Sequence, residues 1–215
     1  MLAIDIETIV DEEQFKNLPP VEVKSGNTKD PQKLKAKGDE AAKKRRAEAG
    51  LNPHCNLICV FGWCDHDMNS GRVVLEDDTA AGEKHLLEQA WEIMAAQGTG
   101  PGLVTFNGFA FDVPIIKLHS LFHRIRPAVS IDNRKYQVGN HLDLRMVLGN
   151  WDPYAPGKLD YYLKRLLGRG KPETIDGSLV QDYWDDGQKD KIADYCEGDA
   201  RDVMELYQVV KAFFL

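Results

Sequence analysis

The chain has 215 residues, 43% of them hydrophobic and 28% charged, a composition that is ordinary for a soluble globular protein. Its length predicts a single domain, residues 1–215. The net charge of −7 and the pI of about 5.4 argue against a protein that coats nucleic acid with its whole surface. No apolar run approaches the ~20 residues that span a membrane, the start lacks a signal-peptide pattern, and the few cysteines fit a reduced environment. We therefore expect a cytoplasmic, intracellular protein that does not contact a membrane.

Residues 1–8 form the first predicted element, a β-strand with apolar Leu2, Ile4 and Ile6 on one face. Side chains two residues apart share a face, so Asp5 and Glu7 present two carboxylates side by side. Two buried anions repel each other, and a divalent metal ion is the usual remedy because hard cations such as Mg²⁺ prefer carboxylate oxygens. The alternative is an edge strand with a solvated acidic face.

A basic insertion is predicted at about residues 22–52. Nine basic and three acidic residues lie between Lys24 and Arg46, although the chain as a whole is acidic. Within it, residues 31–50 have the composition of a polar helix with little apolar face. This helix either holds a nucleic-acid backbone or is simply solvated, and the sequence favours neither alternative.

Two apolar runs, residues 57–63 and 72–75, flank a turn at 67–71 and predict a hairpin that extends the sheet of the first strand. His54, Cys55, Cys59, Cys64 and His66 lie close enough in sequence to suggest zinc. Their spacing is not the C-x2-C of structural zinc sites, and Cys59 and Cys64 should face opposite ways within one strand. We therefore do not predict a zinc site.

A helix over 83–97 is followed by a short apolar strand at 103–106 and then by Asn107-Gly-Phe-Ala-Phe111-Asp112. Ligands collect at the carboxyl ends of strands in open α/β sheets, which makes Asp112 a candidate ligand. The alternative is that Asp112 caps the next helix. The buried stripe predicted for that helix comprises Ile115, Ile116, Leu118, Leu121 and Phe122.

The last predicted helices span residues 160–167 and 189–214, and the second of these carries the sharpest signal. Asp199 falls within its apolar stripe, which is costly unless something pairs with the carboxylate. Tyr195 precedes it by four residues and therefore shares its face. A tyrosine–aspartate hydrogen bond in a satisfied core is the alternative. Asp143 is either a further acid of the site or a helix cap. Residues 168–171, Gly-Arg-Gly-Lys, either contact phosphate or form a loop between two helices.

Asp5-x-Glu7 on a strand, Asp112 after a second strand and Tyr195-x-x-x-Asp199 on a late helix form an ordered set. This order resembles the DEDD superfamily of 3′→5′ exonucleases, in its tyrosine-bearing DEDDy, DnaQ-like branch. Residues 107–114 are similar to the second exonuclease motif of family B DNA polymerases. From residue 1 to about 207, the chain looks like the predicted 3′→5′ exonucleases related to that proofreading domain. It departs at residues 200–202, Ala-Arg-Asp, where Asp-Val is more usual.

The resemblance implies a ribonuclease H-like αβα fold with a central mixed sheet, and two divalent metal ions, Mg²⁺ or Mn²⁺. Asp5, Glu7 and Asp199 would bind the first metal ion, and Asp5 and Asp112 the second. Tyr195 would orient the attacking water rather than deprotonate it, since a phenol has a pKa near 10. In the related enzymes, residues matching Thr8, Ile9, Asn107 and Phe111 contact the terminal nucleotides. Phe111 is equally well explained as a core residue.

We therefore expect a metal-dependent 3′→5′ exonuclease that converts single-stranded DNA to nucleoside 5′-monophosphates. The same chemistry on RNA is the nearest alternative, because no residue can be assigned to reading the 2′-hydroxyl. Two further alternatives are a catalytically silent nucleic-acid-binding module and an exonuclease subunit of a separate DNA polymerase. An intact set of five site residues argues against the silent module.

Overall fold

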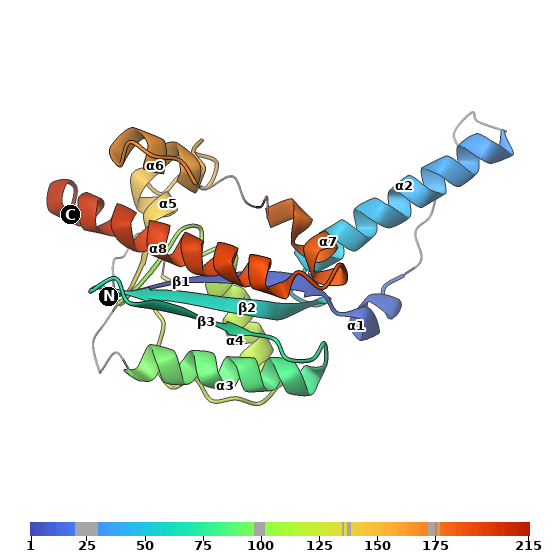
Figure 1. Cartoon of the computed structure of the whole chain (residues 1–215), viewed down its shortest axis with the longest axis horizontal. Coiled ribbons are helices and arrows are strands. Elements are labelled where there is room, and N and C mark those ends of the chain that lie inside the picture. Colours follow the sequence, from blue (N-terminus) through green and yellow to red (C-terminus); the bar gives the residue numbers. More distant parts are fainter. Residues whose placement is uncertain (20–29, 97–101, 135, 137–138, 172–174, 176) are drawn as a thin grey trace.

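A mixed sheet lies at the centre of the molecule (Figure 1). It has five strands, in the order β3-β2-β1-β4-β5. The computed structural model describes residues 1–19, 30–96, 102–134, 136, 139–171, 175 and 177–215. β1 pairs antiparallel with β2 and parallel with β4, so the predicted mixed sheet and its hairpin are confirmed. The strands are β1 (Leu2–Val10), β2 (Asn56–Asp65), β3 (Ser70–Val74), β4 (Leu103–Thr105) and β5 (His141–Asp143).

Helices cover both faces of this sheet, with α3 and α4 on one side and α8 on the other (Figure 1). The helices predicted over 83–97, 160–167 and 189–214 are confirmed to within a few residues. Helices α1, α5 and α7 were not predicted because one or two turns are too short to show a 3.6-residue period. The helices are α1 (Glu12–Lys16), α2 (Pro31–Gly50), α3 (Ala80–Ala96), α4 (Asp112–Phe122), α5 (Leu144–Leu148), α6 (Leu159–Leu166), α7 (Val180–Asp185) and α8 (Lys189–Phe213). In the part of the chain that the structure describes, no helix has the length and apolarity needed to cross a membrane.

The alternation in β1 sets the two faces of the sheet. Leu2, Ile4 and Ile6 are buried in the larger hydrophobic cluster, as their spacing predicts. Asp5, on the other face, lies opposite Gly62 of β2. A Cβ atom on Gly62 would lie 2.7 Å from the carbonyl oxygen of Cys196, so only glycine allows α8 to approach the sheet this closely. This close approach places the acid of α8 above the acids of β1.

The stripe predicted for α4 is correct at its start and wrong at its end. Ile115 and Ile116 are buried, but the side chains of Leu121 and Phe122 are exposed, at 70% and 53%. Two polar residues, His119 and Ser120, take the inward positions of the last turn. Each is fully engaged in hydrogen bonds, Ser120 for example with the indole N–H of Trp91, so their burial is compensated. Hydrophobic periodicity cannot detect such a turn.

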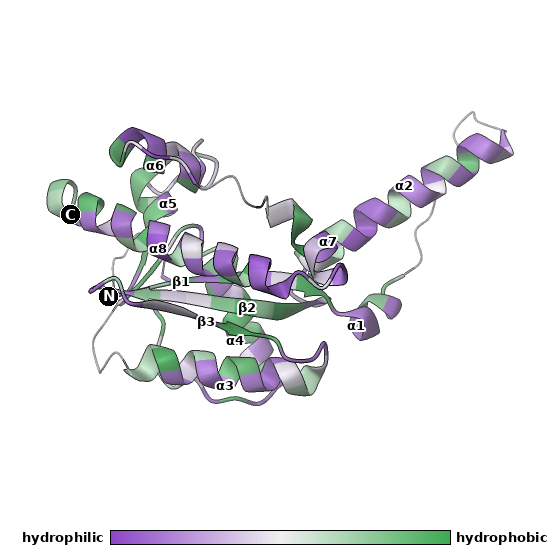
Figure 2. Ribbon diagram, viewed as in Figure 1, coloured by the Kyte–Doolittle hydropathy of each residue, from purple (hydrophilic) through white to green (hydrophobic). Residues whose placement is uncertain are grey.

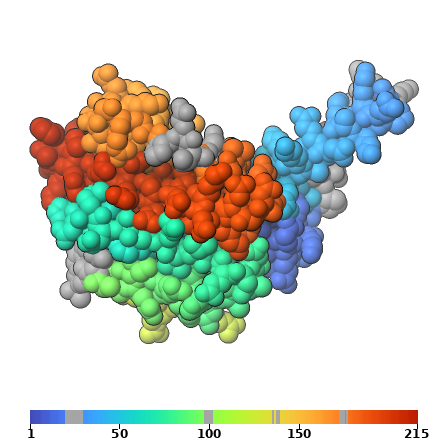
Figure 3. All heavy atoms as spheres, in the orientation of Figure 1, coloured from blue at the N-terminus to red at the C-terminus, as the bar shows by residue number. Residues whose placement is uncertain are grey.

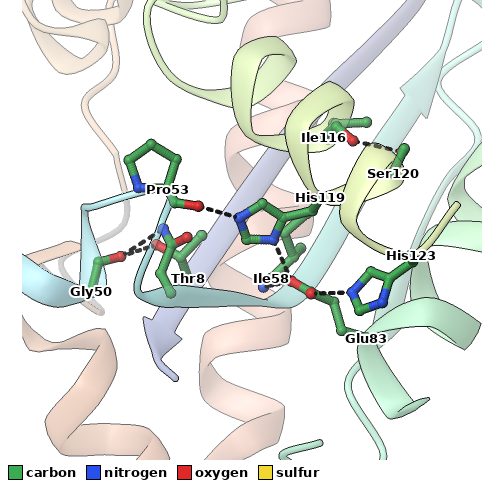
Figure 4. A network of polar contacts seen from close by, with 10 residues as sticks. Thr8, Gly50, Pro53, Ile58, Glu83, Ile116, His119, Ser120 and His123 are labelled. Atoms are coloured by element: carbon green, nitrogen blue, oxygen red, sulfur yellow. Dashed lines mark hydrogen bonds and ion pairs between the residues drawn. The ribbon is translucent and has the colours of Figure 1, made fainter. Parts of the chain in front are cut away.

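Glu83 of α3 is the centre of a buried polar network (Figure 4). Its two carboxylate oxygens lie 2.7 Å from Nδ1 of His119 and 2.6 Å from Nε2 of His123, and one also accepts the backbone N–H of Ile58. On its other side, His119 lies 2.9 Å from the carbonyl oxygen of Pro53, in the loop after α2. The network therefore ties α3, α4, β2 and the end of α2 together.

Helix α2 stands clear of the rest of the molecule, as the ribbon and the space-filling view both show (Figures 1 and 3). Figure 2 shows hydrophilic residues along most of its length, and only Ala49 and Gly50 at its end are buried. The predicted polar helix over 31–50 is confirmed. Residues 20–29, which include Lys24 and Lys29 of the predicted insertion, lie outside the described part of the chain.

Candidate active site

Three carboxylates meet between β1 and α8. Asp5, Glu7 and Asp199 each offer an oxygen, and these three atoms lie within 4.8 Å of one another. The strand alternation brings Asp5 and Glu7 to one face, and the buried stripe of α8 directs Asp199 onto the same face. The arrangement brings together two sequence motifs almost 200 residues apart.

Asp112 joins this group from the end of β4. It is the first residue of α4 rather than its N-cap, and the N-cap position, Phe111, makes no capping side-chain bond. Instead, the Oδ1 atom of Asp112 accepts the backbone N–H of Ile6, between the two acids of β1, at 3.1 Å. Its carboxylate is therefore held against β1, and the capping interpretation is wrong.

The donor set fits a hard divalent cation. The Oδ2 atom of Asp5 is buried and has no hydrogen-bond partner among the described residues. An unpaired buried carboxylate oxygen is costly, and it faces other carboxylates rather than a cation of the protein that would satisfy it. All the donors are oxygens, the ligands that Mg²⁺ and Mn²⁺ prefer. The residues present therefore suit the divalent metal that the sequence predicts.

The pKa values of the clustered carboxyl groups reflect their mutual repulsion. Burial, followed by the negative charges of Asp199 and Asp112, raises the pKa of Asp5 and that of Glu7 well above their ordinary values. Burial also raises the pKa of Asp112 to about 7, although the Ile6 N–H opposes the change. These acids hold protons more tightly than acids in water, and a bound cation would reverse this effect.

Lys171 provides the one ammonium group that contacts this cluster in the described part of the chain. Its Nζ atom donates to Oδ2 of Asp199 at 2.5 Å and to the hydroxyl of Tyr195 at 3.3 Å. Burial and the neighbouring acids raise the pKa of Tyr195 far above its ordinary value, so the phenol stays protonated. Tyr195 can therefore donate a hydrogen bond to a water molecule but cannot act as a base at neutral pH.

A cleft of about 520 Å³ opens over the acids. Asp5 and Asp199 lie in its wall, together with Asn107 and with three basic side chains, those of Arg145, Lys158 and Lys171. Cations around a carboxylate centre suit a polyanionic substrate. Arg145 was not singled out from the sequence, since an isolated basic residue carries no local pattern. Lys171 was noted only within a glycine-rich stretch that a loop explains equally well.

Asp143 braces the loop that carries the second motif. It caps α5 by accepting the backbone N–H groups of Arg145 and Met146, so the capping interpretation is confirmed. Its two oxygens also accept the backbone N–H groups of Asn107 and Phe109, both at 2.9 Å. Asn107, with a φ of 77°, adopts the left-handed conformation that asparagine tolerates well. Its side-chain oxygen accepts from Arg145 at 2.8 Å, which fixes both side chains in the wall of the cleft.

Three of the predicted substrate contacts are not among the residues that line this cleft. The pairing of β1 with β2 shifts register between Glu7 and Thr8, a bulge of the kind often found beside active sites. The Thr8 hydroxyl donates to the carbonyl of Gly50 at 2.6 Å, and Ile9 is buried in the main hydrophobic cluster. Phe111 is half-buried and packs against that cluster. Their contact with substrate therefore stays a prediction.

The cysteines do not form a metal site in the described part of the chain. All four are free and buried, and the acidic trio is the one group there with metal-ligand geometry. Cys59 and Cys64 belong to different hydrophobic clusters, in agreement with their opposite parity in the strand.

Comparisons with known proteins identify the family and the fold of this chain. Residues 52–213 match a family described as predicted 3′–5′ exonuclease related to the exonuclease domain of PolB, a range that includes Asp112, Tyr195 and Asp199. The comparison with curated proteins gave no match. Among solved structures, the family B DNA polymerase from the hyperthermophilic archaeon Pyrobaculum calidifontis is similar, with a TM-score of 0.65 over 99% of this chain at 15% identity. The chain corresponds to 24% of that polymerase, and the likeness confirms the ribonuclease H-like fold.

Proposed function

Since this chain belongs to the family of predicted 3′–5′ exonucleases related to the exonuclease domain of PolB, we propose that it hydrolyses single-stranded DNA from the 3′ end. The products would be nucleoside 5′-monophosphates, released with the help of two divalent metal ions, Mg²⁺ or Mn²⁺. The observation that carries this proposal is the convergence of Asp5, Glu7 and Asp199, with one buried carboxylate oxygen left unpaired. A catalytically silent relative has no use for such a costly arrangement.

In this proposal the carboxylates share two tasks. Asp5, Glu7 and Asp199 would hold one metal ion, and Asp5 and Asp112 the other. Bound there, the metal ions would supply an activated water and stabilise the negative charge on the leaving 3′-oxygen. The hydrogen bond from the Ile6 N–H to Asp112 fixes one ligand before any metal binds.

Tyr195 would position the water that attacks the terminal phosphate. Its hydroxyl oxygen accepts from Lys171, and the hydroxyl is also hydrogen-bonded to Asp199. The hydroxyl proton would be donated to the water instead once Asp199 holds a metal ion. Asn107 and Arg145, fixed to each other in the wall of the cleft, would contact the last nucleotides. Thr8, Ile9 and Phe111 would support these contacts from the sheet and the second motif.

Two 5′-labelled single strands of identical sequence, one DNA and one RNA, test the proposal. With Mg²⁺ or Mn²⁺ we expect a ladder that shortens from the 3′ end, faster for DNA, and that is absent with EDTA. Faster shortening of RNA would make the protein an exoribonuclease. If neither strand shortens with any metal but both bind, the protein is a nucleic-acid-binding module instead. Co-purification with a polymerase would identify it as a subunit of that enzyme.

A further inference from the structure

Helix α2 concentrates positive charge on an acidic protein. It carries seven of the 27 basic residues of the chain and three of its 34 acidic residues, so the remainder has 20 basic and 31 acidic residues. Four lysines of the helix are exposed and make no ion pair within the described residues. They are Lys33, Lys35, Lys37 and Lys43. The helix has one ion pair of its own, Lys44 with Glu48, at 3.7 Å.

Such a helix needs an explanation, because it buries almost nothing along its length. A helix that is polar all round is stable when it bridges other parts, carries many ion pairs or is held by something else. Repulsion between unpaired lysines adds to the cost in the free protein, and a polyanion would remove it. The charge pattern therefore fits an anionic partner along the exposed length of α2.

The base of α2 is fixed firmly to the body. The carbonyl oxygen of Gly50 accepts from the Thr8 hydroxyl at 2.6 Å (Figure 4). It also accepts from the side-chain amide of Asn56 at 3.0 Å. Arg46 pairs with Glu12 and with Asp185 of α7. Together with the bond from His119 to Pro53, these contacts hold the helix in one orientation. A pre-positioned helix loses little conformational entropy when a ligand binds.

The attachment point lies next to the catalytic strand. Thr8, which holds Gly50, directly follows Glu7, one of the three converging acids. At 1.5 Å per residue, the 20-residue helix extends about 30 Å from this point, a length comparable to several nucleotides of a strand. A strand whose 3′ end lies at the acids is thus within reach of the lysines.

We propose that α2 binds the phosphate backbone of the single strand whose 3′ end occupies the acidic site. This inference rests on the proposed function. The helix contributes affinity and substrate retention but no base specificity, since lysines read charge and not sequence. Long strands would therefore be bound and degraded in preference to very short ones.

The first test measures binding without cleavage. A fluorescent DNA strand of about 30 nucleotides is titrated in EDTA at several KCl concentrations, since the salt slope reports phosphate contacts. The arm variant carries Lys33→Gln, Lys35→Gln, Lys37→Gln and Lys43→Gln, which remove charge while keeping a good helix former. The matched control carries Lys84→Gln, Lys117→Gln, Arg126→Gln and Lys211→Gln, four exposed cations outside α2.

For each arm lysine that contacts phosphate, the slope of log K against log salt should become about 0.7 less steep, and the affinity at ~0.1 M salt should fall about fivefold. The control should keep the wild-type slope. Equal slopes and affinities for the arm and control variants would overturn the inference, and would leave an acidic protein as the partner that the charge of α2 fits.

The second test separates the helix from the catalytic centre. With Mn²⁺, the arm variant should hydrolyse the long strand more slowly than wild type, but a trinucleotide, too short to reach along α2, at a similar rate. An equal loss on both substrates would mean that the variant damages the centre itself and would overturn the inference. If wild type hydrolyses neither substrate, the proposed function fails, while the titration in EDTA still decides whether α2 binds the strand.

Discussion

Glu83 is a buried carboxylate and the two acids of β1 are half-buried, but the larger difference between them lies in their surroundings. Glu83 accepts hydrogen bonds from His119, His123 and a backbone N–H, and these outweigh the effect of burial and lower its pKa to about 2. Asp5 and Glu7 face other acids instead, and their pKa values are raised. A buried acid whose partners are all internal stabilises the fold, whereas one without them indicates a ligand from outside.

The largest effect should come from removing a charge at the acidic site. Asp5→Asn or Asp199→Asn should lower the 3′→5′ exonuclease rate by about 10³-fold or more, since a lost metal ligand costs several kcal/mol of transition-state stabilisation. In EDTA, Asp5→Asn should be no less stable than wild type, because it relieves repulsion among the clustered carboxylates, whereas Asp199→Asn also loses the ion pair with Lys171. Initial rates on a labelled strand and urea denaturation measure the two effects.

Asp190→Asn, at an exposed acid in the first turn of α8, is the control for this experiment. It should change neither the rate nor the stability appreciably. A near-normal rate for Asp5→Asn would contradict the assignment of the site.

Glu83→Gln should have the opposite pattern, a loss of stability with activity retained in the folded fraction. Removing one partner of a buried pair leaves the other group uncompensated, which typically costs about 3–5 kcal/mol. The measurement is the free energy of unfolding in urea. Glu88→Gln, on the exposed side of the same helix, should change it by less than ~0.5 kcal/mol. A normal free energy for Glu83→Gln would show that the network contributes nothing to the fold.

The pH dependence of stability separates the two groups by sign. A raised pKa means that the folded state binds more protons than the unfolded state, so in EDTA the contribution of Asp112 is lost as the pH rises from about 4 through about 7. The loss is on the order of 1 to 4 kcal/mol. Glu83, with a lowered pKa, contributes stability above pH 4 that is lost as the pH falls toward about 2.

Thermal denaturation in EDTA between pH 5 and 8 measures the first effect. Asp112→Asn should flatten the decline of the melting temperature with rising pH. Addition of Mg²⁺ should raise the melting temperature of the wild-type protein at pH 8. A decline in Asp112→Asn as steep as in wild type would assign the effect to other groups.

The sequence was sufficient to predict those parts of the site that depend on local periodicity. The period of two in β1 predicted that Asp5 and Glu7 share a face, and the period near 3.6 in α8 predicted that Asp199 points inward. Both predictions hold because the apolar partners of these residues are buried as expected. The mixed sheet and the hairpin that extends it were also predicted, whereas the order of the strands was not.

Local patterns could not predict the contacts that depend on tertiary structure. The bulge after Glu7 reorients Thr8 toward Gly50, and no feature of the sequence marks it. Leu121 and Phe122 are exposed because His119 and Ser120 satisfy their hydrogen bonds inside, a partnership between α4 and α3 that hydropathy does not record. Lys171 reaches Asp199 across 28 positions of sequence, so only the structure pairs them.

Lys171→Gln should have the smallest effect of these changes. It tests Asp199, an acid with one internal ion-pair partner, which is intermediate between Glu83 and the acids of β1. The ammonium group pairs with Asp199 in the metal-free protein, so its removal should destabilise that state by about 1 kcal/mol. The same ion pair must open before Asp199 can bind a metal ion, so the stabilisation by saturating Mg²⁺ should increase in the variant. Melting temperatures with EDTA and with Mg²⁺ measure both effects, and Lys164→Gln, at an exposed ion pair with Asp160, is the matched control. An unchanged response to Mg²⁺ would mean that Lys171 does not compete for Asp199, and that its bond to Tyr195 is the contact that matters.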